Sequence, residues 1–192
     1  MFREYVRPAI LSFIILTAIT GFIYPLGVTW IAQTFFPEQA NGSLIYHDGK
    51  AIGSTLIGQP YDDPKYLWGR LSATSPQPYN GASSSGSNIG PSNPSLADSV
   101  RARITALRSA DPDNKMPIPV DLVTSSASGL DPHISMASGY YQAGRIARAR
   151  GMSEEAVKDV MDRNTSGRFL GLIGERTVNV LKVNIKLDSY KK

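Results

Sequence analysis

Residues 8–37 read PAILSFIILTAITGFIYPLGVTWIAQTFFP and contain no charged side chain. About 20 apolar residues in a helix cross the hydrocarbon core of a bilayer, because a helix rises 1.5 Å per residue and the core is roughly 30 Å thick. The run is therefore long enough to span a membrane with some tilt. Pro25 and Gly27 interrupt the run, but transmembrane helices tolerate both residue types. The stretch predicts a transmembrane anchor helix over residues 8–36.

Two other interpretations of this stretch are weaker. A cleaved signal peptide would use Arg3 and Arg7 as its basic region, but the nearest small-x-small site, Ala18-Ile19-Thr20, lies inside the apolar run. A buried core helix would normally show a polar face, and this run has none. The membrane anchor explains the composition better than either alternative.

The charges that flank the run predict its orientation. Arg3 and Arg7 precede it, whereas no Lys or Arg follows it before Lys50. By the positive-inside rule we expect residues 1–7 in the cytoplasm and residues 37–192 outside. The chain should then be a single-pass protein of the inner (plasma) membrane with an extracytoplasmic domain.

The composition limits the chemistry of residues 37–192. Their length suits one domain with a hydrophobic core of its own. The chain has no cysteine, which excludes a disulfide, a thiolate metal site and a cysteine nucleophile. Its net charge of +4 is mild for 192 residues, so we expect a solvated surface and no nucleic-acid partner.

Turn signals and apolar periodicity divide the domain into short elements. Asn41-Gly42 precedes a predicted hairpin with strands over residues 44–46 and 51–57, joined through Asp48-Gly49. Helices are predicted over residues 94–110 after the N-cap Asn93, over 136–150 after Ser135, and over 154–164 after Ser153. Apolar runs predict strands over residues 118–124, 169–173 and 178–187, the last with a bulge near Leu181. This order predicts an α+β (α/β-like) extracytoplasmic domain on a single N-terminal transmembrane helix.

A loop is predicted over residues 61–93, and residues 72–95 are rich in Ser, Gly, Pro and Asn. Its composition is that of a flexible linker, but a plain linker has no use for Trp68 or Tyr79. Long ordered loops in compact domains are often functional. From the residues alone, an ordered functional loop and a disordered excursion stay equally open.

Neither the histidines nor the serines form a convincing catalytic set. Ser128, Asp131 and His133 lie on one short turn, whereas the members of a catalytic triad normally converge from separate segments. We expect no catalytic residue and no metal site, and we expect His133 to order the turn by hydrogen bonds. The turn from Ser125 to Gly129 resembles an anion cradle, because it runs toward a helix N-terminus. A tight turn with Gly129 at positive φ and serines capping the backbone is the stronger interpretation.

The arginines of the predicted helices lie off the apolar stripes and should form solvated faces. They are Arg101, Arg103, Arg108, Arg145, Arg148 and Arg150. Those at the end of the second helix would also suit its dipole.

An ordered set of short segments along the whole chain resembles the C subunit of the Kdp-type potassium-transporting P-type ATPase. No single segment is specific, but the set in this order on a chain of this length is. The segments are Ile19-Thr20-Gly21, Tyr24-Pro25, residues 39–44, residues 56–59, residues 68–74, Pro78-Tyr79-Asn80, residues 86–94, residues 126–135, Gln142 with Arg145, and residues 178–181. Leu71, where we expect the family to show proline, and extra polar length around residues 83–85 are minor departures.

The resemblance implies a non-catalytic subunit of a four-part pump. Its partners would be a channel-like A subunit that selects potassium, a P-type B subunit that hydrolyses ATP, and a small F peptide, in contact with membrane lipid. The family's C subunit is described as a catalytic chaperone that raises the ATP affinity of the B subunit. The resemblance implies no tightly bound cofactor and leaves ATP as the candidate ligand. The implied nucleotide-binding residues are Ser126, Ser128, Gly129, Gln142 and Arg145.

The predicted topology conflicts with nucleotide contact, because an extracytoplasmic domain cannot reach cytoplasmic ATP. We therefore expect the chain to act by docking on its partner subunits, with glycines of the anchor allowing close helix approach. The expected docking residues are Gly21, Gly27, Trp68, Arg70, Tyr79, Asn80, Asn88 and Asn93. The alternative is a pilin-like or other membrane-anchored structural protein of the cell envelope. It is weaker because a pilin needs a processing site and an acidic residue within the apolar run.

Overall fold

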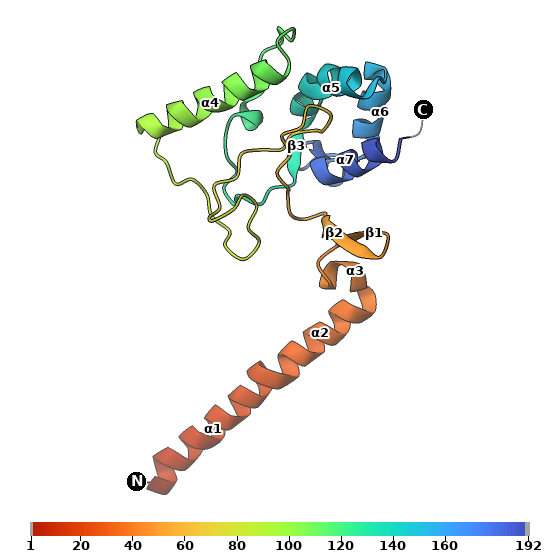
Figure 1. The fold of residues 1–192 in the computed structure, drawn as a ribbon. Coiled ribbons are helices and arrows are strands. Elements are labelled where there is room, and N and C mark those ends of the chain that lie inside the picture. Colours follow the sequence, from red (N-terminus) through yellow and green to blue (C-terminus); the bar gives the residue numbers. More distant parts are fainter. Residues whose placement is uncertain (1, 191–192) are drawn as a thin grey trace. The chain divides into compact units, whose positions relative to one another are not determined.

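The computed structural model describes residues 2–190, which divide into two compact units at the Leu44–Ile45 boundary. The first unit contains the long apolar helix, and the second contains the mixed helix and sheet domain (Figure 1). Within the second unit, helices α5, α6 and α7 gather around the short strand β3, and α4 lies apart from them. The predicted mixture of helices and strands is confirmed.

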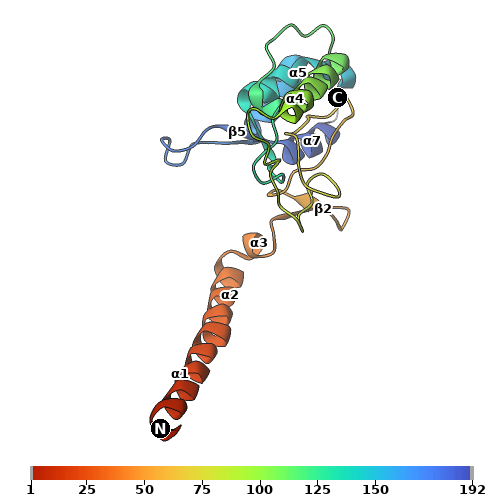
Figure 2. The same ribbon diagram turned by 90° about the vertical axis from the view of Figure 1, so that its left-hand side faces the viewer.

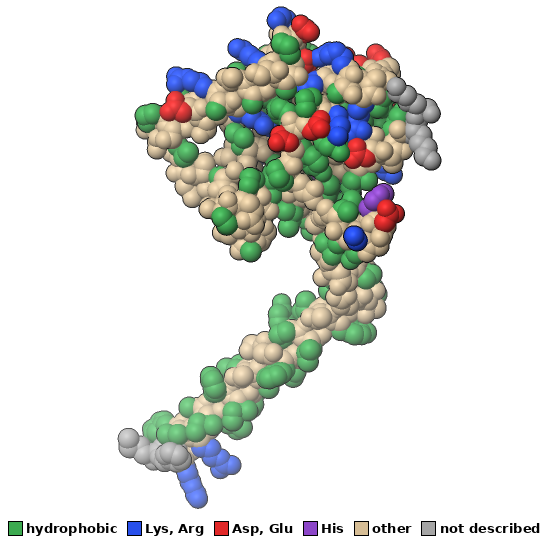
Figure 3. Space-filling view, viewed as in Figure 1, with side chains coloured by type: hydrophobic (Ala, Val, Ile, Leu, Met, Phe, Trp, Pro, Cys, Tyr) green, Lys and Arg blue, Asp and Glu red, His purple; other side chains and the backbone are tan. Residues whose placement is uncertain are grey.

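The apolar stretch forms one helix over Arg3–Phe35, long and apolar enough to cross a membrane, and none of its most apolar window is buried. The helical segments in this part of the chain are η1 (Phe2–Val6), α1 (Arg7–Ala18), η2 (Ile19–Ile23) and α2 (Tyr24–Phe35). The π-helical segment η2 ends two residues before Pro25, and the Tyr24 N–H donates to the carbonyl of Ile19, five residues back. This wider turn accommodates the proline ring, which clashes with the preceding turn of a regular helix. On the face in Figure 3, basic side chains colour only the N-terminal end of this helix.

The short helix α3 (Pro37–Ala40) follows, and then the hairpin of β1 (Leu44–His47) and β2 (Lys50–Ser54). Asp48 and Gly49 both have positive φ, 48° and 75°. A two-residue turn with positive φ at both positions is the type I′ geometry that Asp-Gly favours. The predicted hairpin is confirmed, and its second strand is shorter than expected.

The core of the second unit lies between α5 (Met136–Arg150), α6 (Glu154–Arg163), α7 (Val180–Asp188) and a three-stranded antiparallel sheet. The sheet order is β3 (His133–Ser135), β5 (Thr177–Asn179), β4 (Thr165–Ser166), with Ile134 opposite Val178. The predicted caps are confirmed: Ser135 and Ser153 accept backbone hydrogen bonds at the starts of α5 and α6, and Gly151 ends α5 at φ 62°. Fully buried side chains include Leu67, Leu122, Ile134, Ile146, Met161 and Val178.

Helix α4 (Pro94–Ala110) begins as predicted, with the Asn93 side chain accepting from Ser95 N–H. The strand predicted over residues 118–124 is wrong, because this segment holds only the 3₁₀ turn η3 (Val120–Leu122). Pro117 and Pro119 explain the difference, since proline cannot donate to a sheet ladder. The strand predicted over residues 169–173 is reduced to a turn closed by one bridge between Phe169 and Ile173.

The long final strand predicted over residues 178–187 is also wrong. Strand β5 ends at Asn179, whose side chain caps α7 by accepting from Lys182 N–H. Val180, Val183, Asn184 and Leu187 are buried at spacings of three and four residues, which is helical periodicity. The position near Leu181, where a bulge was predicted, is where the strand gives way to a helix.

Candidate functional site

The centre of the domain is the contact between Trp68 and Gln142. The Trp68 N–H donates to Gln142 Oε1 at 2.9 Å, and Gln142 Nε2 donates to the carbonyls of Trp68 (3.1 Å) and Ser138 (3.2 Å). The Gln142 side chain is 1% exposed. A buried amide with partners at both ends is a structural clamp, because breaking it would leave several polar groups unpaired.

The neighbouring residue Leu67 is held in the same way from α7. Its N–H donates to Asn184 Oδ1 at 2.8 Å, and its carbonyl accepts from Asn184 Nδ2 at 3.0 Å. Sequence reasoning missed Asn184 because it assigned this segment to a strand. The sequence did hold a signal, because Asn184 falls on the same helical face as Val180 and Leu187. An amide buried on an apolar face needs specific hydrogen-bond partners. Together Gln142 and Asn184 satisfy the main chain of two consecutive loop residues.

Arg145 is buried, which corrects the expectation that it lies on a solvated face. Its guanidinium donates to the carbonyl of Pro64 and to Gln142 Oε1 (2.7 Å), and it lies over the Trp68 ring at 4.6 Å. Burial lowers its pKa to about 10. Arg103 lies over the same ring at 5.1 Å and is half-buried, so it also departs from the predicted solvated face. The indole therefore carries two cation–π contacts.

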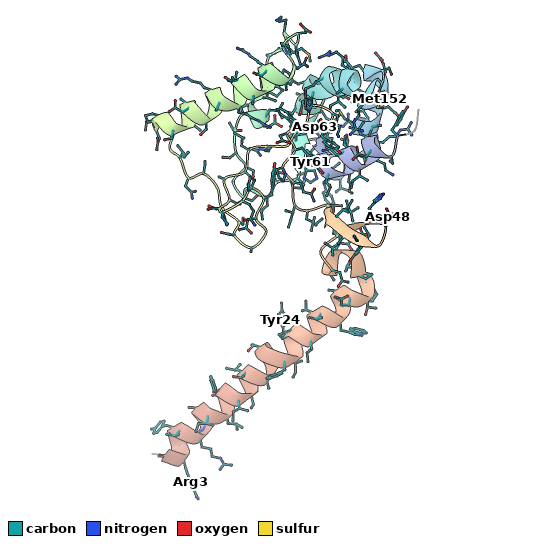
Figure 4. The ribbon with its side chains drawn as sticks, viewed as in Figure 1. Arg3, Tyr24, Asp48, Tyr61, Asp63 and Met152 are labelled. Atoms are coloured by element: carbon teal, nitrogen blue, oxygen red, sulfur yellow. The ribbon has the colours of Figure 1, made fainter. Side chains whose placement is uncertain are left out.

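The loop segment before Trp68 completes this cluster. Trp68 Nε1 donates to the carbonyl of Asp63 at 3.0 Å, and the rings of Tyr61 and Tyr66 contact each other at 5.2 Å. Figure 4 labels Tyr61 and Asp63 where this segment enters the domain. The residues around Trp68 are thus ordered by specific bonds, as the functional-loop alternative expects.

Arg70 and Tyr79 lie together on the next part of the loop. The Tyr79 hydroxyl donates to the Arg70 carbonyl at 2.5 Å, and burial raises the pKa of this phenol. Arg70 pairs with Asp131 at 3.2 Å and donates to the Ser125 carbonyl at 3.1 Å. Burial acts to raise the pKa of Asp131, but hydrogen bonds from His133 and Arg70 outweigh it and lower that pKa. These contacts join the loop to the Ser/Gly turn.

The polar groups of the Ser/Gly turn bond within the domain. Gly129, at φ 66°, donates its N–H to Ser126 Oγ, and Leu130 N–H donates to Ser128 Oγ. The Gly129 carbonyl accepts from Ser72 Oγ at 2.7 Å. This arrangement is the tight turn with capping serines that the sequence favoured over an anion cradle. Nucleotide contact through Ser126, Ser128, Gly129, Gln142 and Arg145 stays a prediction.

His133 also serves the turn, as expected. The backbone N–H of His133 donates to Asp131 Oδ1 at 3.0 Å, and its imidazole Nε2 lies 3.3 Å from Asn179 Nδ2. Among the described residues, no group of three or more His, Cys, Asp or Glu side chains could hold a metal ion.

The remaining predicted docking residues are spread over both units. Asn80 fixes the loop by donating its side-chain amide to the Ser75 carbonyl at 3.0 Å. Asn88 is exposed at φ 51°, and Asn93 caps α4. Gly21 and Gly27 lie on the exposed surface of the long helix, where a Cβ at Gly27 would meet no atom within 4 Å. Their prediction as docking residues therefore rests on exposure and on the family resemblance.

A groove of ≈ 500 Å³ separates the loop from α4. Its lining includes Leu71, Ile89, Leu96 and Val123. Ser72, Ser99 and Arg103 also line it, and apolar side chains combined with polar groups are typical of a binding groove.

Comparison with known proteins gives the family. The family described as "K+-transporting ATPase, c chain" matches residues 6–189. The "Potassium-transporting ATPase KdpC subunit" of Sorangium cellulosum (strain So ce56) is 59% identical over 187 residues, covering 97% of this chain and 98% of the relative. The protein with the same description from Dechloromonas aromatica (strain RCB) is 59% identical over 190 residues, covering 99% of this chain and 100% of the relative.

The family match runs from residue 6 through the long apolar helix, the loop and the domain to residue 189. It also sets aside the pilin-like alternative. The chain belongs to the KdpC family of potassium-transporting ATPase subunits.

Proposed function

We propose that the chain is a single-pass, non-catalytic subunit of a Kdp-type potassium uptake pump. One apolar helix over Arg3–Phe35 supports membrane anchoring. Arg3 and Arg7 at its start support an N-terminus in the cytoplasm and residues 37–192 outside. Activity of a C-terminal reporter that works only in the cytoplasm would contradict this orientation.

In this role the chain assembles with the A, B and F subunits and raises the ATP affinity of the B subunit by contact, as a catalytic chaperone. The internal bonding of Gln142 supports the contact mechanism. To reach a nucleotide, the Gln142 amide would have to leave Trp68 and Arg145, whose polar groups it satisfies. Leaving such groups buried and unpaired costs about 1–3 kcal/mol for each. Contact between subunits requires no such rearrangement.

The docking surface we propose is the loop over residues 72–92. Its base is bonded to the Ser/Gly turn, because Ser84 Oγ and Ser85 N–H both donate to the Ser128 carbonyl at 3.0 Å. Ala82, Ser87 and Asn88, which lie on either side of these bonded residues in the sequence, are exposed. A surface that is ordered before contact loses little conformational entropy on binding, which favours affinity.

A pair of matched substitutions tests the docking surface. Ala82 lies on the loop and Ala106 on α4, and both are exposed. We expect Ala82→Arg to release the chain from the pump when the A and B subunits are affinity-purified, because a large charged side chain would block the contact. Ala106→Arg should leave co-purification unchanged.

If both variants co-purify like the wild type, the loop is not the docking surface. If both fail to co-purify, the effect is not specific to the loop, and the proposal is equally contradicted.

A further inference from the structure

The loop over residues 168–176, between β4 and β5, exposes a group of large apolar side chains. Leu172 is 82% exposed and Leu170 79%, and Phe169 and Ile173 are each 68% exposed. Figure 2 shows the chain before β5 projecting from the domain. Contiguous exposed apolar groups on a soluble domain mark a contact with a protein or a membrane.

The 168–176 loop is ordered in this shape by its own backbone. Phe169 and Ile173 exchange hydrogen bonds of 2.8 Å and 3.1 Å, and Leu172 N–H donates to the Phe169 carbonyl at 3.1 Å. Gly171 lies at φ 74° inside this turn. Since the turn is formed in advance, the apolar tip is presented without an ordering cost on contact.

Basic side chains lie at both ends of the apolar tip. Arg168 and Arg176 flank it, and Glu175 is the only acidic residue in the loop. Arg168 Nη2 lies 3.6 Å from Glu175 Oε2. The Arg168 side chain is 50% exposed and the Glu175 side chain 85% exposed. Guanidinium groups beside apolar side chains match the phosphates and acyl chains at a bilayer surface.

The composition of the tip favours lipid over a pocket on a protein. Hot spots of protein interfaces are enriched in Trp, Tyr and Arg, and Leu is under-represented in them. The tip offers Phe169, Leu170, Leu172 and Ile173 around one glycine, with no side-chain hydrogen-bond donor or acceptor to specify a protein partner. An acyl-chain region requires no such group.

A short connection tethers the domain to the proposed anchor and so keeps the domain close to the membrane. This step rests on the proposed membrane anchoring. Nine residues lie between the end of the helix at Phe35 and Ile45, and this connection can span at most about 35 Å at full extension. The stem of the loop is also joined to the segment after the hairpin, because Asn179 Nδ2 donates to the Thr55 carbonyl at 2.9 Å. Tethering at this distance raises the effective concentration of the bilayer around the loop.

We propose that the 168–176 loop inserts its apolar tip into the interface of the membrane that holds the anchor. The four apolar side chains enter the boundary between headgroups and acyl chains, and Arg168 and Arg176 contact lipid phosphates. The domain then has a second attachment to the membrane besides its helix.

Nitroxide labelling of the full chain tests this proposal. The chain has no cysteine, so Leu172→Cys creates a unique labelling site. The labelled chain is placed in vesicles of phosphatidylethanolamine and phosphatidylglycerol, and collisions of the nitroxide with oxygen and with a water-soluble nickel chelate are measured. Lys115→Cys, at an exposed polar position, is the aqueous control, and Leu16→Cys is the control within the anchor.

We expect the label at position 172 to collide with oxygen several-fold more often, relative to the nickel chelate, than the label at 115. Adding Leu170→Asp to the labelled chain should return position 172 to the value of the aqueous control. Free access of the nickel chelate to position 172 would overturn the proposal, and exclusion of both reagents would overturn it in favour of a protein contact. A label at position 16 that is open to the nickel chelate would instead contradict the membrane anchoring itself.

Discussion

The side-chain amide of Gln142 pairs with the peptide groups of Trp68, accepting from its N–H at 2.9 Å and donating to its carbonyl at 3.1 Å. Asn184 does the same for Leu67 from another helix. The backbone N–H and carbonyl groups of Leu67 and Trp68 are thus all hydrogen-bonded, as they would be in a β-strand. Here side-chain amides supply the partners that a neighbouring strand would supply. These two amides hold the main chain that leads into the proposed docking loop.

Replacing Gln142 by methionine keeps the volume of the side chain and removes its polar groups. We expect Gln142→Met to lower the free energy of unfolding by about 3 kcal/mol, because the peptide groups of Trp68 and the Arg145 guanidinium lose a buried partner. Urea unfolding of the full chain in detergent micelles measures this. Gln77→Met, at an exposed position, should change the value by less than about 0.5 kcal/mol. Equal stability of the two variants would show that the clamp contributes nothing.

The two amide clamps should depend on each other, because they hold consecutive residues. We expect Asn184→Leu to destabilise the chain as well. We expect the double variant with Gln142→Met to lose at least about 0.5 kcal/mol less than the sum of the single losses. The physical reason is that the first substitution already releases the loop. A double-mutant cycle measured by urea unfolding gives this coupling, and additivity of the two losses would contradict it.

Gly129 is required by its backbone angle and by its surroundings. A Cβ at this position would lie 2.6 Å from the Ser85 carbonyl oxygen, and φ is 66°. We expect Gly129→Ala to cost at least about 2 kcal/mol of stability, since both strain and collision oppose it. Gly167→Ala is the matched control, because a Cβ there has open space. The expectation fails if the two variants have the same midpoint in thermal unfolding.

Asp131 gives the domain a defined response to acid. Burial acts to raise its pKa, but hydrogen bonds from His133 and Arg70 lower it overall. A carboxyl group with a lowered pKa in the folded state adds stability above the unfolded pKa of about 3.9, and this contribution is lost as the pH falls through the folded pKa. Asp131→Asn should therefore reduce stability at pH 7 and flatten its fall between about pH 5 and pH 3, the range these pKa values set. Urea midpoints across this range measure the slope, and an unchanged slope would contradict the assignment.

Local signals in the sequence predicted much of the fold. The caps Asn93, Ser135 and Ser153, the end of α5 at Gly151 and the Asp48-Gly49 turn were all predicted, because each depends on a few neighbouring residues. The apolar helix was predicted because thirty residues without a charged side chain are typical of a membrane-spanning helix.

Elements that depend on tertiary contact were predicted less well. The segment after Asn179 has apolar residues at spacings that fit a strand or a helix over a few positions, and burial of Asn184 against Leu67 favours the helix. Arg145 was placed on a solvated face because an arginine near a helix end usually lies there. Only the approach of Trp68 and Pro64 from a distant loop explains its burial.

The proposed function requires that the chain raise ATP affinity by docking and not by contact with the nucleotide. The decisive experiment adds this chain to a pump assembled without it and measures the KM for ATP hydrolysis. Ser128→Ala removes a hydroxyl that the family resemblance implies in nucleotide binding and that accepts from Leu130 N–H. Ala82→Arg blocks the proposed docking surface. We expect Ser128→Ala to lower the KM as the wild type does and Ala82→Arg to leave it high. A lowered KM with Ala82→Arg, together with a KM that stays high with Ser128→Ala, would contradict action by docking.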